Sequence, residues 1–164
     1  MVRLIALFLV LFLAGCGYKP MRSYTQEVLG ERVYVYVKVF LRDPRNAIFI
    51  KNAVHEAVLE RFGSRLAKKE DAQTQIEVRI KRIDFRPLEY DKYGYVVYYR
   101  TTTALEFLYK KGEREERFLT SGYYDFPIES NSVITDTLRF LAIKESANKA
   151  IDQFIARLSC MGVH

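Results

Sequence analysis

An apolar run near the N-terminus, closed by small residues and a cysteine, is the feature that most constrains this chain. Arg3 precedes the run, which covers residues 4–13, and Ala14, Gly15 and Cys16 follow it. A basic start, a short apolar segment and small residues before a cleavage site are typical of a secretory signal peptide. The run is about half as long as a membrane-spanning helix. We therefore expect removal of the first 15 of the 164 residues, which leaves 149 to fold as one domain.

The tetrapeptide Leu13-Ala14-Gly15-Cys16 resembles the bacterial lipobox. In lipoproteins with this motif the cysteine thiol is lipidated, cleavage makes the cysteine the first residue, and its amine is acylated, commonly with palmitate. Gly17 follows, whereas Asp at this place retains enterobacterial lipoproteins in the inner membrane. We expect a protein anchored by lipid at Cys16 on the periplasmic side of the outer membrane. The alternative is an ordinary signal peptide with a chance cysteine.

The remaining chemistry-bearing residues are sparse. Cys160 is the only other cysteine, so the mature chain has no partner for an intramolecular disulfide. We expect its thiol to be partly buried at a helix end, with a redox or intermolecular role as the alternative. His55 has no second histidine or cysteine nearby and is expected to be solvated or capped. Since no nucleophile elbow, phosphate loop or metalloprotease motif is present, we expect no enzyme, no catalytic residue, no cofactor and no metal.

The mature chain is basic. Loss of Arg3 reduces the 26 basic residues to 25, against 20 acidic residues, so the formal net charge is +5. Nucleic acid is not a partner outside the cytoplasm. The expected counter-charges are lipid head groups, phosphates and sugar acids, and the alternative is ordinary surface solvation.

Hydrophobic patterns define the expected elements after a tether over residues 16–30. Valines alternate with Tyr34, Tyr36, Lys38 and Phe40, which predicts a strand over residues 32–41. Apolar residues at helical spacing predict a helix over 47–62. Further patterns predict strands over 75–84, 95–109 and 116–125, a loop over 86–94, and a last helix over 133–158 that is capped within 130–132.

This order predicts a single α+β domain over residues 31–160. A strand–helix–strand start favours a parallel pair, and the later strands favour antiparallel meanders. We therefore expect a two-layer α/β sandwich, in which two helices cover one face of a mixed four-stranded sheet in the order β-α-β-β-β-α. The open face then carries either the aromatic or the aliphatic side of the first strand.

Tyrosine is the most distinctive component, with 12 residues in the chain. Large rigid side chains with a polar end are good interface anchors, although tyrosine also favours strands in general. Basic residues are interleaved with the tyrosine-rich segments. The tyrosines in or near the expected loop and the basic candidates are Tyr90, Tyr93, Tyr95 and Tyr98, and Arg86, Lys92, Lys110, Lys111 and Arg114.

Four features together are similar to one family of lipoproteins. They are Cys16-Gly17-Tyr18-Lys19-Pro20 after the lipobox, the expected helix around Asn52-Ala53-Val54-His55-Glu56-Ala57-Val58, a long third strand, and a last helix over residues 147–158. In these features the chain resembles the LptE family of lipopolysaccharide-assembly lipoproteins. The resemblance implies a lipoprotein that sits inside the LptD outer-membrane barrel, plugs it, aids its assembly and binds lipopolysaccharide.

The resemblance also suggests roles for the candidate residues. Lys92-Tyr93-Gly94 is similar to a basic-X-Gly turn in the family, so Lys92 is the first choice for a lipopolysaccharide contact. Arg86, Lys110, Lys111 and Arg114 are further candidates on charge alone. Tyr90, Tyr93, Tyr95 and Tyr98 are candidates for the barrel interface. The alternative function is a freestanding outer-membrane lipoprotein with a role in envelope structure or peptidoglycan binding.

Overall fold

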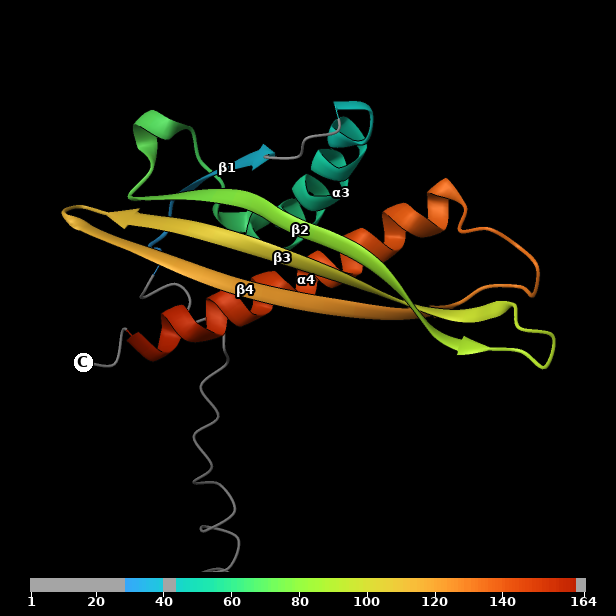
Figure 1. Cartoon of the computed structure of the whole chain (residues 1–164). Coiled ribbons are helices and arrows are strands. Elements are labelled where there is room, and N and C mark those ends of the chain that lie inside the picture. The colour runs from blue at the N-terminus through green and yellow to red at the C-terminus, as the bar shows by residue number, and fades with distance from the viewer. Residues whose placement is uncertain (1–28, 40–43, 162–164) are drawn as a thin grey trace, which may run out of the picture.

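A computed structural model describes residues 29–39 and 44–161. The expected signal peptide, the lipidation site Cys16, residues 17–28 of the tether, and Phe40 lie outside these residues. The elements follow the expected order (Figure 1) and are β1 (Val33–Val39), α3 (Pro44–Phe62), the 3-10 turns η1 (Gly63–Arg65) and η2 (Lys69–Asp71), β2 (Thr74–Tyr90), β3 (Val96–Lys111), β4 (Arg114–Pro127) and α4 (Asp136–Met161).

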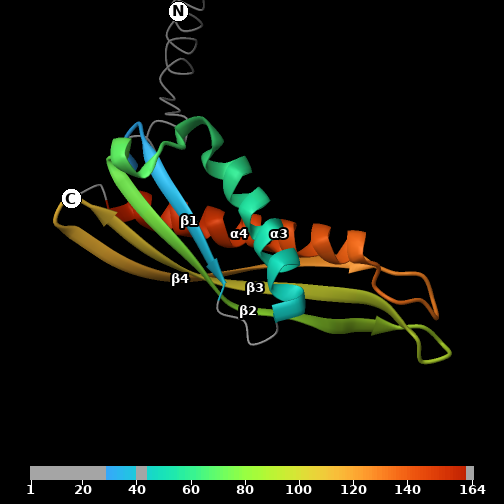
Figure 2. The same ribbon diagram turned by 90° about the horizontal axis from the view of Figure 1, so that it is seen from above.

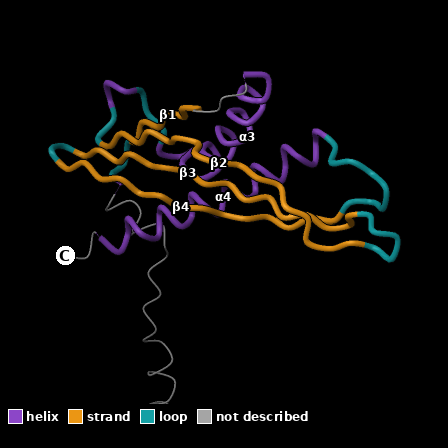
Figure 3. Tube along the Cα trace, viewed as in Figure 1, coloured by secondary structure: helices purple, strands orange, loops and turns teal. Residues whose placement is uncertain are grey.

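The four strands form one mixed sheet in the order β1-β2-β3-β4 (Figure 3). β1 pairs with β2 in parallel, from Val33 beside Thr74 to Val39 beside Ile80. The other two pairings are antiparallel. The α+β architecture with a parallel first pair and two meanders is therefore confirmed.

Both helices lie on one face of the sheet (Figure 2). α4 runs along β3 and β4, and α3 packs against α4 and β1. The aliphatic side of β1 faces the helices, since Val33 and Val37 are buried in the core, whereas Tyr36 is exposed. The other buried apolar residues of the core include Ile76, Val78, Ile80, Leu105, Phe107, Tyr109, Phe118, Ala147, Ile151 and Phe154. The open face of the sheet thus carries the aromatic side of β1.

β2 is longer than the sequence pattern indicated, and the predicted loop over 86–94 is wrong for residues 86–90. β2 continues to Tyr90 and pairs with β3 along this whole length. Its register shifts between Ile80 and Arg82 and again after Pro87. β1 ends beside Ile80, so Pro87 lies on an edge and at a bulge, the two places where a strand tolerates proline.

Two details at the ends of α4 also differ from expectation. The cap predicted within residues 130–132 is wrong, because α4 begins at Asp136 and Thr135 Oγ1 accepts a 3.3 Å hydrogen bond from the Leu138 N–H. Cys160 is exposed rather than partly buried. It occupies the last turn of the helix, beyond Leu158, which is the last buried residue of the apolar stripe.

Candidate functional site

The turn between β2 and β3 is built around one aspartate. The Asp91 carboxylate accepts hydrogen bonds from the backbone N–H of Tyr93 at 2.8 Å and of Tyr95 at 2.9 Å. The Gly94 N–H donates to the Asp91 carbonyl at 3.0 Å, and Gly94 has a φ of +85°, which glycine adopts without strain. The sequence Asp-Lys-Tyr-Gly therefore folds into a turn in which the backbone N–H groups of Asp91, Tyr93 and Gly94 donate hydrogen bonds.

Asp91 also connects this turn to the loop between β4 and α4. The Ser130 hydroxyl donates a hydrogen bond to the second carboxylate oxygen of Asp91. This bond, followed by those from the backbone N–H groups, holds the pKa of Asp91 below its usual value. The carboxylate is thus charged at neutral pH, and its hydrogen bonds fix the conformation of the turn.

Large side chains project from this turn into solvent. Tyr93 is 72% exposed and Tyr90 is 61% exposed, while Tyr95 and Leu88 are exposed to a smaller extent. The Lys92 ammonium lies 4.9 Å from the centroid of the Tyr93 ring. We name this group, formed by Leu88, Tyr90, Lys92, Tyr93 and Tyr95, the tip surface. It combines apolar area, hydroxyl groups and one cation on an ordered turn.

Arg86 and Tyr98 lie next to the tip surface on the open face of the sheet. Tyr98 pairs with Glu89 and is half-buried, and Arg86 pairs with Arg100 and is exposed. Arg100 is held by Asp125 through two charge-assisted hydrogen bonds of 2.7 Å. These bonds raise the pKa of Arg100 and lower that of Asp125. The charge of Arg100 is therefore compensated by Asp125. Arg86, by contrast, is exposed and forms no ion pair with any described residue.

The other three basic candidates are not brought to this site. Lys110, Lys111 and Arg114 lie at the turn between β3 and β4, and β3 has 16 residues, so about 50 Å of strand separates them from Lys92. Arg114 contacts Glu116 at 2.9 Å. The five basic candidates thus form two groups at opposite ends of the sheet.

Sequence reasoning missed two residues of the tip surface and its scaffold. Asp91 falls within the predicted loop, and no role was predicted for it, although an aspartate in a turn can accept hydrogen bonds from the backbone that follows it. No sequence pattern marked Leu88 as a surface residue, because its exposure depends on the extension of β2 to Tyr90. Tyr90, Tyr93 and Tyr95 are brought together as expected for neighbours in one turn.

No arrangement suited to metal chemistry occurs in residues 29–39 and 44–161, where no group of three His, Cys, Asp or Glu side chains could hold an ion. His55 is exposed on α3, as expected for a solvated imidazole. Within the same residues, neither helix is long and apolar enough to cross a membrane.

Comparison with known proteins provides independent information. The family described as LptE: Lipopolysaccharide-assembly matches residues 34–158, which is well over half of the chain. Rare lipoprotein B from Shewanella oneidensis has a similar structure, with a TM-score of 0.51 and 14% identity over 80% of this chain and 96% of that one. This likeness supports a shared fold. No curated protein matches the sequence.

Two further solved structures are similar to a lesser degree. A putative lipoprotein from Caulobacter crescentus aligns with a TM-score of 0.48 and 9% identity over 87% of this chain and 98% of that one. Uncharacterized lipoprotein B from Nitrosomonas europaea aligns with a TM-score of 0.44 and 13% identity, over 81% of this chain and 85% of that one.

Proposed function

Because the chain belongs to the LptE family and so has a role in lipopolysaccharide assembly, we propose that it plugs and helps assemble an LptD-type outer-membrane barrel and binds lipopolysaccharide. In this proposal Cys16 carries the lipid anchor that holds the protein on the periplasmic side of the outer membrane. The chain is a binding protein and not an enzyme, and it uses no cofactor.

The observation that carries the proposal is the ordered, exposed tip surface. Tyrosines that are fixed by their backbone lose little conformational entropy on binding, and each supplies a broad apolar area with a hydroxyl at its end. Tyr93 and Tyr90 are the most exposed of the tyrosines at the tip. These side chains are suited to contact the barrel wall.

Lys92 supplies the charge that a phosphorylated ligand requires. Its ammonium lies above the Tyr93 ring and is not neutralised by an ion pair within the described residues. A lysine binds phosphate as a point charge, and Arg86, farther along β2, adds a planar guanidinium that can bind an anion through two hydrogen bonds. The tip surface thus offers aromatic contacts to a protein, and Lys92 together with the neighbouring Arg86 offers cationic contacts to lipopolysaccharide.

Crosslinking in cells tests the barrel partnership. A photoreactive amino acid in place of Tyr93 should crosslink to a large outer-membrane barrel, whereas the same group in place of Glu113, at the opposite turn, serves as the matched control. Crosslinks of equal yield from both positions, or none from Tyr93, would contradict the proposed interface. Co-sedimentation with purified murein sacculi in the absence of a barrel partner would instead favour the peptidoglycan-binding alternative.

Binding measurements test the lipopolysaccharide contact. Lys92→Glu should weaken binding of purified lipopolysaccharide at low ionic strength, because it reverses the charge at the tip and leaves the sheet intact. Lys51→Glu is the matched control, since Lys51 is exposed on α3 and lies far from the tip along the chain. Equal losses in the two variants would indicate a general charge effect and remove Lys92 from the site.

A further inference from the structure

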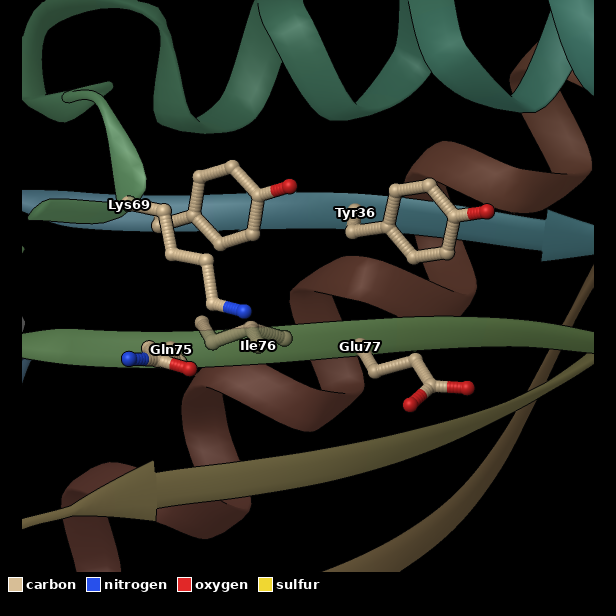
Figure 4. A pocket seen from close by; sticks show the side chains of 6 residues that line it. Tyr36, Lys69, Gln75, Ile76 and Glu77 are labelled. Atoms are coloured by element: carbon tan, nitrogen blue, oxygen red, sulfur yellow. The ribbon is translucent and has the colours of Figure 1, made fainter.

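A depression lined by polar and aromatic residues lies on the open face of the sheet, where β1 pairs with β2 (Figure 4). Its volume is about 300 Å³. It is separate from the tip surface, because β1 and the first half of β2 form it. The residues that line it are Tyr34, Tyr36, Lys69, Gln75, Ile76 and Glu77.

The strand pattern places two tyrosine rings side by side in this depression. Tyr34 and Tyr36 alternate with the buried Val33 and Val37, so both point to the open face, about 7 Å apart. Tyr36 is 48% exposed. The rings therefore form no part of the core, and their exposure is not required by packing between the helices and the sheet.

Polar groups surround the rings on two sides. Gln75 pairs with Tyr34 and Glu77 pairs with Tyr36, so their side chains lie beside the rings on β2. Figure 4 shows Lys69 reaching from η2 across β1 toward Gln75. Among the described residues, neither the Lys69 ammonium nor the Gln75 amide has a hydrogen-bond or ion-pair partner, and both are available to a ligand.

The depression is lined by one cation, Lys69, and one carboxylate, Glu77. Glu77 is bound by Arg79, with 2.7 Å between Oε1 and Nε, and this hydrogen bond lowers the pKa of Glu77. The carboxylate is charged but compensated. Lys69 is therefore the charge that remains to attract an anion.

We infer that this depression binds a pyranose ring with an anionic substituent, in the saccharide part of lipopolysaccharide. The C–H face of such a ring packs on flat aromatic side chains, and its hydroxyls exchange hydrogen bonds with the Gln75 amide and the tyrosine hydroxyls. Lys69 pairs with the carboxylate or phosphate. An acyl chain fits less well, because it would cover these polar groups without satisfying them.

This inference rests on the proposed function for the identity of the ligand, but its test is separate. The probe is the core oligosaccharide that mild acid releases from lipopolysaccharide, without lipid A. We expect calorimetry with the full chain in detergent to detect binding of this oligosaccharide. Tyr36→Ala and Lys69→Gln should each lower the affinity about tenfold or more. The effect of Lys69→Gln should shrink at high salt, since it removes a charge interaction.

Two control variants decide what a loss of binding means. Tyr123→Ala removes a tyrosine that is 50% exposed on the same face, at the opposite edge of the sheet, and should leave oligosaccharide binding unchanged. Lys51→Gln removes an exposed lysine on α3, outside both proposed binding sites, and should leave oligosaccharide binding unchanged. Circular dichroism and thermal unfolding establish that all four variants fold.

The outcomes separate this inference from the proposed function. If intact lipopolysaccharide binds but its oligosaccharide does not, or if Tyr36→Ala and Lys69→Gln bind the oligosaccharide as the unaltered chain does, the saccharide site is overturned while the proposed function stands. If the oligosaccharide binds through Tyr36 and Lys69 but no barrel is crosslinked, the saccharide site stands and the proposed plug function fails.

Discussion

Gly122 of β4 lies directly against the backbone of Ser146 in α4. A Cβ atom at position 122 would be 2.1 Å from the Ser146 carbonyl oxygen and 2.6 Å from the Ala150 nitrogen. Two hydrogen bonds hold the helix at this short distance. Thr120 donates to the Ala150 carbonyl at 2.7 Å, and the hydroxyls of Thr103 and Ser146 are 2.6 Å apart. The close contact between α4 and the sheet thus requires glycine, which has no side chain, at position 122.

Gly122→Ala should destabilise the protein strongly. The added methyl group would collide with helix backbone, which cannot move aside as a flexible side chain can, so α4 must shift from the sheet. Overpacking of this kind costs about 3 kcal/mol of the free energy of unfolding. Urea unfolding of the mature chain measures the loss.

Gly63→Ala is the matched control for this prediction. A Cβ atom at position 63 would meet no other atom within 4 Å, and Gly63 has no positive φ, so alanine there should change stability by less than about 1 kcal/mol. Similar unfolding midpoints for the two variants would show that α4 does not approach the sheet as closely as described.

Lys144→Met should weaken the contact between the two helices by a small amount. The Lys144 ammonium of α4 contacts the Glu60 carboxylate at 2.8 Å and the Glu56 carboxylate at 3.2 Å, both on α3. The two glutamates are well exposed, so water screens the interaction, and we expect a loss of about 1 kcal/mol or less. Lys51→Met, at an exposed position on α3, should have no effect in the same urea titration.

The same cluster predicts a dependence of stability on pH. Hydrogen bonds from Lys144 and then from Asn148 lower the pKa of Glu60 below its usual value. A carboxyl whose pKa is lower in the folded state stabilises the fold above its unfolded-state pKa, and this contribution disappears as the pH falls through the folded-state pKa. Unfolding midpoints should therefore fall on acidification below about pH 5. Glu60→Gln should make that decline shallower, and an unchanged slope would exclude Glu60 as a contributor.

The regular elements were predictable because local patterns determine them. The alternation around Val33 and Val37 specified a strand with one buried side, and the apolar stripe from Ala147 to Leu158 specified a helix with one buried side. The parallel first pair followed from the helix between the strands. These features depend on neighbours in the sequence and on general rules of connection.

The features that the sequence did not reveal depend on contacts between distant segments. The extension of β2 through Pro87 depends on where β1 ends, and the α4 cap at Thr135 depends on the path of the loop after β4. The depression beside Tyr36 needs Lys69 from η2, which alternation within β1 cannot indicate. The sequence indicated that the tyrosine-rich turn is exposed. It did not indicate the hydrogen bond from Ser130 to Asp91 that fixes the conformation of the turn, because these residues lie 39 positions apart.

Asp91→Ala should disorder the tip surface without unfolding the domain. It removes the acceptor for the backbone N–H groups of Tyr93 and Tyr95 and for the Ser130 hydroxyl, all at an exposed turn outside the core. Amide hydrogen exchange at Tyr93 and Tyr95, followed by NMR, should become much faster, while core amides of β3 stay protected. Asp91→Asn is the matched control, because its side-chain oxygen still accepts the backbone hydrogen bonds and should preserve slow exchange. Crosslinking from Tyr93 should then decrease in the alanine variant and persist in the asparagine variant, since the interface needs a fixed turn. Unchanged exchange in Asp91→Ala would show that the turn is ordered by other contacts.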